Sequence, residues 1–208
     1  MTDILFIGDV HGKFEKYKNV LSRNKNSYDY SIQVGDMGIG FRNDLMPEMG
    51  PNDFFIRGNH DDPTMCKKSI NYIHDGTIFN IPNGEKMMLI GGALSIDAYR
   101  RVEGVNWWRD EELSYYELDH LIDIYVREKP MIMTTHEFPD SFTNENLISP
   151  HKEKYPSVTR QAFETMFSLH KPKFWIGGHW HTHVNMNFHG TQFICLDELD
   201  AKILQLGS

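Results

Sequence analysis

The sequence has 208 residues, of which 40% are apolar and 24% charged, which is typical of one globular domain and too apolar for a disordered chain. Lysine and arginine number 21 against 29 aspartates and glutamates, so the net charge of −8 argues against extended binding to nucleic acid. The two cysteines provide no disulfide framework, and no basic segment with a long apolar run opens the chain. We therefore expect a single domain over residues 1–208, cytoplasmic and without membrane contact.

Apolar runs that end in glycine recur along the first half of the chain. The run 4–7 predicts a buried strand, and apolar residues at helical spacing from Phe14 to Leu21 predict a helix after it. Further strands are predicted at 31–34, 54–56 and 86–90, each followed by a glycine within a few residues. Strand, loop and helix in alternation indicate an α/β protein.

The second half continues the same alternation after an irregular stretch, 92–109, whose length is typical of a functional or a disordered loop. A helix is predicted over 110–129, with Asp110, Glu111 and Glu112 in its first turn. The other predicted elements are strands at 131–135, 173–176, 184–188, 193–196 and 201–206, and a helix at 159–170.

Seven side chains suited to metal binding fall at or just after predicted strand ends. They are Asp9, His11, Asp36, Asn59, His136, His179 and His181. Because ligands bind in the crevice at the carboxyl ends of strands in open α/β sheets, residues far apart in sequence can converge there. Imidazole and carboxylate without thiolate suit zinc, manganese or iron in an open catalytic site.

Two ions explain this number of ligands better than one, since a catalytic zinc ion keeps only about three protein ligands. Two divalent ions about 3.5–4 Å apart, bridged by one carboxylate, form the arrangement used for displacement at phosphorus. Against the carboxylates of Asp9 and Asp36, two such ions leave a local charge of about +2. An acidic protein can therefore still attract a phosphate at this point.

The motifs that carry these residues resemble the motif set of the calcineurin-like metallophosphoesterases, in the family's order. They are Asp9-Val10-His11, Gly35-Asp36, Gly58-Asn59-His60-Asp61, Thr135-His136-Glu137 and Gly178-His179-Trp180-His181, and the resemblance spans residues 3 to about 184. The segment from Gly91 to Trp108 is also similar to one in small bacterial and phage members. The resemblance implies an α/β fold of two packed mixed β-sheets flanked by helices, a four-layer α/β/β/α sandwich.

The resemblance also implies a role for each site residue. Asp9, His11, Asp36 and His181 would hold the first metal, and Asn59, His136 and His179 the second, with Asp36 as the bridge. His60 would stabilise or protonate the leaving oxygen, oriented by Asp61. His179, His181 and His183 alternate, so His181 and His183 are an alternative metal-binding pair, but the family's spacing after glycine favours the earlier two.

The expected activity is hydrolysis of phosphate esters by a hydroxide that two divalent ions activate, with Mn²⁺ expected and iron, zinc or nickel as alternatives. The expected substrates are nucleotides or other small phosphoesters, cleaved by a phosphodiesterase or phosphatase. A serine/threonine protein phosphatase is disfavoured, because this chain has Asp61 and Met37-Gly38 where those enzymes commonly have glutamate and Arg-Gly. A noncatalytic interaction module on the same fold is the other alternative, and the presence of all seven ligands argues against it.

Charged and aromatic residues in the irregular stretch are candidates for substrate contact. Arg100 and Arg101 could pair with a phosphate, or could be solvated surface residues. Trp107 and Trp108 could stack on a base, although a structural role, in which they cover the hydrophobic core at the start of the following helix, is slightly favoured.

Overall fold

The apolar runs of the chain form two mixed β-sheets in the computed structural model, which describes residues 1–41, 45–82, 84–148 and 155–207. The first sheet has the strand order β10-β1-β2-β3, with β10 at Ala201–Leu206, β1 at Thr2–Ile7, β2 at Tyr30–Gln33 and β3 at Asp53–Phe55. The second has the order β4-β5-β6-β7-β9-β8, with β4 at Thr77–Asn80, β5 at Lys86–Ile90, β6 at Ile132–Thr135, β7 at Phe174–Gly177, β9 at Thr191–Cys195 and β8 at Val184–Phe188.

The central strands of each sheet are parallel, and the antiparallel strands lie at edges. β1, β2 and β3 run parallel beside antiparallel β10. β5, β6, β7 and β9 run parallel between antiparallel β4 and β8. Parallel neighbours end at the same edge of a sheet, so the loops after these strands can bring their side chains together.

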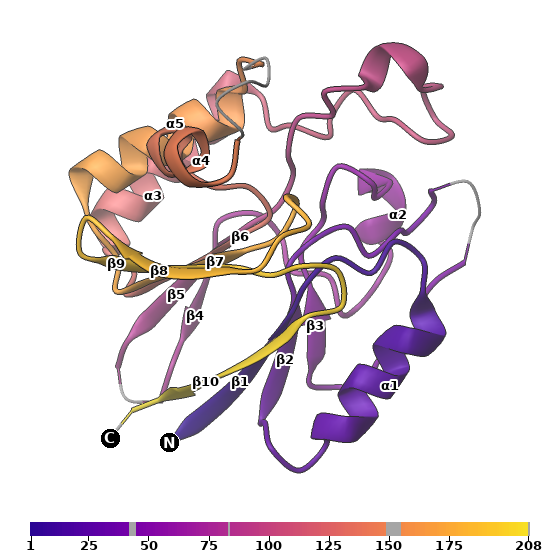
Figure 1. Ribbon diagram of the computed structural model, residues 1–208, viewed down its shortest axis with the longest axis horizontal. Helices are drawn as coiled ribbons and strands as arrows, with labels where there is room; N and C mark the ends of the chain where they lie inside the picture. Colours follow the sequence, from indigo (N-terminus) through magenta and orange to yellow (C-terminus); the bar gives the residue numbers. More distant parts are fainter. Residues whose placement is uncertain (42–44, 83, 149–154, 208) are drawn as a thin grey trace.

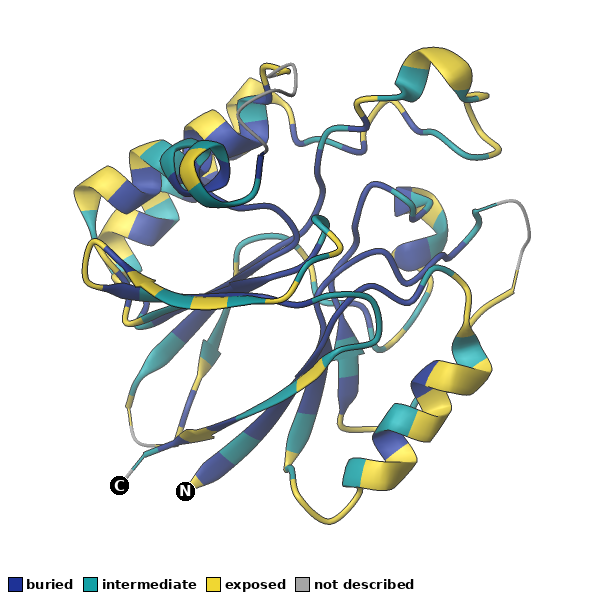
Figure 2. Ribbon diagram, in the orientation of Figure 1, coloured by how far each residue is buried: buried dark blue, intermediate teal, exposed yellow. Residues whose placement is uncertain are grey.

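Three hydrophobic clusters separate four layers, which confirms the predicted α/β/β/α sandwich. Ile4 and Phe6 of β1 face Met87 and Leu89 of β5 in the cluster between the two sheets. Neighbouring residues on the same strands point the other way, toward the helices. Strands buried on both faces explain the continuous apolar runs in the sequence (Figures 1 and 2).

Helices cover the outer face of each sheet (Figure 1). On the first sheet, α1 (Phe14–Asn24) buries Tyr17 and Leu21 against β1, and the short α2 (Pro63–Cys66) adds Cys66 to the same cluster. On the second sheet, α3 (Tyr115–Glu128), α4 (Asp140–Asn146) and α5 (Val158–Leu169) pack against the strands. None of the helices in the described part of the chain is both long and apolar enough to cross a membrane.

The predicted start of the helix over 110–129 was wrong. α3 begins at Tyr115, because Ser114 caps it and exchanges hydrogen bonds with Glu117 in a capping box. Glu111 lies outside the helix and is only 3% exposed, so its carboxylate does not serve the helix dipole. The sequence analysis also missed β4, α2 and α4, whose short lengths give little periodic signal. The 92–109 stretch is irregular as predicted, apart from one 3₁₀ turn at Ala98–Arg100.

Candidate metal centre

The seven predicted ligands lie on loops that directly follow strands and meet between the carboxyl ends of the two sheets. Asp9 and His11 follow β1, Asp36 follows β2, Asn59 follows β3, His136 follows β6, and His179 and His181 follow β7. Four of them have left-handed backbones, with φ values of 50° at His11, 58° at Asp36, 69° at His179 and 46° at His181. Such non-glycine conformations cost energy and cluster at functional sites.

The first group of donor atoms comprises Asp9, His11, Asp36 and His181, whose donor atoms all lie within 4.8 Å of one another. The Nε2 atom of His181 lies 3.1 Å from Oδ2 of Asp9 and 2.9 Å from Nε2 of His11. Nε2 of His11 lies 3.7 Å from Oδ2 of Asp9 and 3.9 Å from Oδ2 of Asp36. Two imidazoles and two carboxylates are a donor set that suits a divalent transition ion.

The second group comprises Asp36, His136 and His179, so Asp36 belongs to both. Nε2 of His136 lies 3.2 Å from Oδ1 of Asp36 and 3.2 Å from Oδ1 of Asn59. Nδ1 of His136 donates a hydrogen bond to the carbonyl oxygen of Val34 at 2.9 Å. A neutral His136 therefore presents the Nε2 lone pair to the site, as a metal ligand requires.

The arrangement around His136 favours a positive charge at the second group. A lone pair on Nε2 would face the oxygens of Asp36 and Asn59. The nitrogen lone pair and these oxygens repel each other unless a proton or a cation lies between them. Burial acts to lower the pKa of His136, but the charge and hydrogen bond of Asp36, with smaller effects of Asp9 and Val34, together outweigh it and raise the pKa to about 10. Burial acts to raise the pKa of Asp36, but His136, His60 and His11 together overcome this effect, and the pKa falls well below the usual value. The donor set thus fits a divalent cation.

Close approach of the backbone at two glycines allows the ligands to meet. A Cβ atom on Gly58 would lie 2.0 Å from Oδ1 of Asp36 and 2.7 Å from Nε2 of His136. A Cβ atom on Gly178 would lie 2.2 Å from Oδ1 of Asp9. Any larger residue would displace a ligand, so only glycine fits at these two positions.

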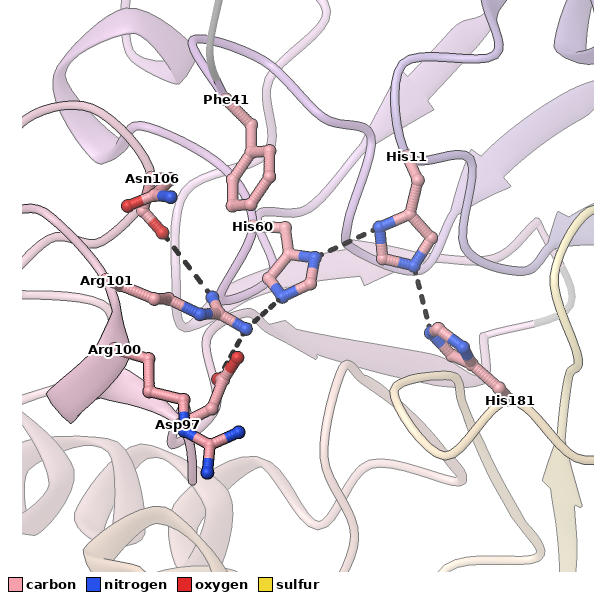
Figure 3. A pocket seen from close by; sticks show the side chains of 8 residues that line it. All are labelled: His11, Phe41, His60, Asp97, Arg100, Arg101, Asn106 and His181. Carbon is pink, nitrogen blue, oxygen red and sulfur yellow. Dashed lines mark hydrogen bonds and ion pairs between the residues drawn. The ribbon is translucent and has the colours of Figure 1, made fainter.

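A cavity of about 500 Å³ opens beside the first group of donors (Figure 3). Its lining residues are His11, Phe41, His60, Asp97, Arg100, Arg101, Asn106 and His181. Nη2 of Arg101 lies 2.6 Å from Nε2 of His60 and 2.6 Å from Oδ1 of Asp97. Both predicted substrate arginines therefore line the cavity that the metal ligands adjoin.

His60 is held differently from the prediction. Its ring stacks on Phe41 with ring centroids 4.7 Å apart, and its Nε2 atom accepts a hydrogen bond from Arg101, because a guanidinium can only donate. Burial lowers the pKa of His60 to about 4, although the charge of Asp36 opposes the effect. Protonation of His60 for the predicted acid role requires Arg101 to release Nε2, and that role stays a prediction.

Asp61 supports the ligand loops rather than the His60 ring. Its carboxylate accepts hydrogen bonds from the backbone N–H groups of Met37, Gly38, Ile39 and Gly58 at 2.7–3.2 Å. Burial raises its pKa to about 6, with the backbone hydrogen bonds acting in the opposite direction. Asp61 thus connects the loop after β2 to the loop after β3, and the predicted orientation of His60 by Asp61 stays a prediction.

His183 lies outside both groups of donor atoms. Its Nδ1 atom lies 2.8 Å from Oδ2 of Asp200, whereas the first group contains His181 and the second contains His179. Trp108 is 8% exposed and lies 6.3 Å from the Phe41 ring, as expected of a residue that covers core.

The sequence analysis missed Phe41, Asp97 and Asn106 as cavity residues. Phe41 lies beyond the second motif, and the other two lie in the irregular stretch, where no periodicity indicates which side chains point inward.

The calcineurin-like phosphoesterase family matches residues 2–183, which is most of the chain, and the protein belongs to this family. Similar solved structures include a dimetal phosphatase from Danio rerio, with a TM-score of 0.56 at 13% identity, over 95% of this chain and 88% of that one. A phosphopantetheinyl hydrolase from Mycobacterium tuberculosis has a TM-score of 0.53 at 13% identity, over 94% and 89%.

A candidate 5′-nucleotidase from Staphylococcus aureus has a TM-score of 0.56 at 14% identity, over 99% of this chain and 51% of that one, so this chain spans about half its length. None of the curated proteins compared matches the chain. At these identities the structural likeness establishes the fold alone.

Proposed function

We propose that the protein hydrolyses phosphate esters of nucleotides or other small molecules at a dinuclear metal centre. The observation that carries the proposal is the sharing of Asp36 by two groups of donor atoms beside a cavity that also holds two arginines. Asp9, His11, Asp36 and His181 would hold one ion, and Asp36, Asn59, His136 and His179 the other. When bound, two divalent ions supply a hydroxide nucleophile at neutral pH and stabilise charge on phosphoryl oxygens.

The chain's own residues bind and orient the ester. The Arg101 side chain is 10% exposed, and its Nη2 atom contacts His60 and Asp97. Its guanidinium would donate to phosphate oxygens that enter the cavity by exchanging these two contacts for the phosphate. Arg100 is exposed at the cavity mouth and would add a weaker, solvent-screened attraction. His60 lies between Arg101 and the first donor group, where its imidazole would contact the leaving oxygen.

The size of the cavity supports a small substrate. About 500 Å³ lies within the usual range of small-molecule sites, about 300–1,000 Å³. The net charge of −8 gives no general attraction for nucleic acid. The name of the Staphylococcus aureus protein, a candidate 5′-nucleotidase, agrees with a nucleotide substrate, and that of the Danio rerio protein, a dimetal phosphatase, agrees with two metal ions.

The test loads the protein with Mn²⁺, Zn²⁺, Fe²⁺ or Ni²⁺, counts bound ions by elemental analysis and measures hydrolysis of mono-, di- and cyclic nucleotides, aryl phosphate esters and a phosphopeptide. Two ions per chain and turnover of small esters are expected. Asp36→Asn should retain the fold and lose at least about 100-fold in turnover, since even outer partners of metal ligands cost 10- to 100-fold. Turnover of the phosphopeptide alone would support a protein phosphatase, and two bound ions with no turnover of any ester would support an interaction module.

A further inference from the structure

Two buried polar side chains in the irregular stretch are bonded to each other. Ser95 is 4% exposed and Glu111 is 3% exposed. The Ser95 hydroxyl lies 2.7 Å from Oε2 of Glu111, and the Ser95 backbone N–H donates to Oε1 of Glu111 at 2.7 Å. We call these two residues the Ser95–Glu111 pair.

The Ser95 hydroxyl also meets a predicted metal ligand and a cavity arginine. Nδ2 of Asn59 lies 3.0 Å from Oγ of Ser95, and Nη1 of Arg101 lies 3.1 Å from the same oxygen. A serine hydroxyl has one proton to donate and two lone pairs to accept with. All three of its hydrogen-bonding functions are therefore used.

The chemistry of these neighbours fixes the direction of every hydrogen bond. An ionised glutamate can only accept and an arginine can only donate, so the Ser95 proton goes to Glu111. The contact with Asn59 must then be donated by its amide N–H. The Asn59 amide oxygen is consequently turned the opposite way, where it lies 3.2 Å from Nε2 of His136 in the second donor group.

We propose that the Ser95–Glu111 pair is a positioning device that orients the Asn59 side chain, so that its oxygen and not its NH₂ group faces the second metal position. The inference rests on the proposed dinuclear function, because it assigns a role toward one of the two ions. The same hydroxyl fixes Arg101, so the pair connects the metal ligand to the substrate side of the cavity.

The main chain at Glu111 is held by a contact that does not involve the Glu111 carboxylate. The main chain at this point is already held by Arg57, whose Nη1 atom donates to the carbonyl oxygens of Asp110 at 3.0 Å and Glu111 at 2.8 Å. Arg57 is itself 3% exposed and paired with Asp75 at 3.3 Å. The carboxylate of Glu111 is therefore not needed at its own main chain, and it binds both the backbone N–H and the hydroxyl of Ser95.

The direct test is Glu111→Gln, which puts an NH₂ donor where Oε2 accepts the Ser95 proton. The hydroxyl must then turn its proton toward Asn59, and the Asn59 amide must flip its NH₂ group toward the second ion. We expect the affinity for the second Mn²⁺ to fall by about 10- to 100-fold, with the first unchanged, in calorimetric titrations of the full chain. Burial raises the pKa of Glu111 against the effect of its hydrogen bonds to Ser95, so the titrations are run at pH 8 to keep it ionised.

Glu112→Gln is the matched control, because it makes the same chemical change one residue away. The Glu112 carboxylate accepts from the Ser157 hydroxyl at 2.7 Å and from the Thr159 backbone N–H at 3.2 Å, at the start of α5. Both Mn²⁺ affinities should equal those of the wild type in this variant. An equal loss of the second ion in both variants would overturn the proposal, because the effect would then belong to general loosening of the chain.

A double-mutant cycle with Asn59→Asp separates orientation from charge. A carboxylate at position 59 can only accept, so it conflicts with a hydroxyl committed to Glu111 but suits one that Glu111→Gln has released. Asn59→Asp should therefore improve binding of the second Mn²⁺ more in the Glu111→Gln background than in the wild type, and the cycle cancels the effect of the added charge alone. Equal effects in both backgrounds would overturn the proposal.

Failure of the proposed function and instability of the Glu111→Gln variant give results that differ from failure of the positioning role. A wild-type chain that never binds a second ion would refute the proposed function itself, before any variant is compared. Should Glu111→Gln melt below the titration temperature, Ser95→Ala removes the acceptor of the Asn59 N–H group directly. Unchanged affinity for the second Mn²⁺ in Ser95→Ala would then overturn the proposal, and a fall of the same size would support it.

Discussion

The loops that carry the metal ligands and the irregular segment 92–111 both face the site, yet they are fixed in opposite ways. The ligand loops are fixed by the backbone. They follow buried strands directly, four of their residues have left-handed φ values, and Gly58 and Gly178 let chain segments touch. Segment 92–111 contains only one 3₁₀ turn, and the side chains of Ser95, Glu111 and Arg101 connect it to the site.

This difference indicates a division of labour. Backbone strain and close packing hold the donor atoms in a geometry that a metal pair requires, and such a structure tolerates almost no change. Side-chain hydrogen bonds hold the substrate side, where Ile96, Tyr99, Val102 and Val105 are exposed. Changes in segment 92–111 outside the Ser95–Glu111 pair should therefore alter substrate selection while the ions stay bound.

The largest effect should come from a methyl group in a ligand loop. Gly58→Ala places a Cβ atom 2.0 Å from Oδ1 of Asp36, so we expect loss of both ions and a decrease of about 1–3 kcal/mol or more in unfolding free energy. Gly104→Ala in segment 92–111 is the comparison. A Cβ atom there meets no described atom within 4 Å, so only the strain of a φ of +78° should lower the unfolding free energy, by about 1 kcal/mol, and both ions should stay bound. Denaturant unfolding and ion counting measure both variants, and retention of two ions in Gly58→Ala would contradict the steric argument.

An intermediate effect should follow removal of Arg101, the partly buried arginine of the cavity. Arg101→Ala loses charge-assisted hydrogen bonds of about 1.5–3 kcal/mol, so kcat/KM for a phosphate ester should fall by about 10- to 100-fold with two ions still bound. Arg100→Ala should lower it only severalfold, because that side chain is exposed to water. Steady-state kinetics on the metal-loaded variants distinguish the two, and equal losses would mean that neither arginine is specific to the phosphate.

The smallest effect is expected beyond the ligand loops, at His183. Its pair with Asp200 is half exposed, at 58% and 39% of the two side chains, so His183→Ala should change stability by no more than about 1 kcal/mol and leave both ions bound. His181→Ala should lose the first ion. If elemental analysis found that His183→Ala loses an ion and His181→Ala keeps both, His183 rather than His181 would be the metal ligand.

The fold follows largely from local sequence patterns. Apolar runs identified β1 and β5, because most positions of a strand that is buried on both faces are apolar. Short elements such as β4 and α2 gave no comparable pattern, and the start of α3 depended on a serine cap rather than on the acidic residues before it. The pairing of β1 with the distant β10 also depends on packing across the whole chain.

For the site, the sequence by itself determined which donors are present and that each follows a strand, because strand ends and glycine turns are local properties of a few neighbouring residues. The family resemblance already implied that Asp36 is shared. Only the tertiary structure decided that Arg101 rather than Arg100 lies beside His60, and that Ser95 and Glu111 contact and orient Asn59. Such contacts join residues tens of positions apart. Their hydrogen-bond directions depend on where packing places each donor and acceptor, which no local pattern of residue types contains.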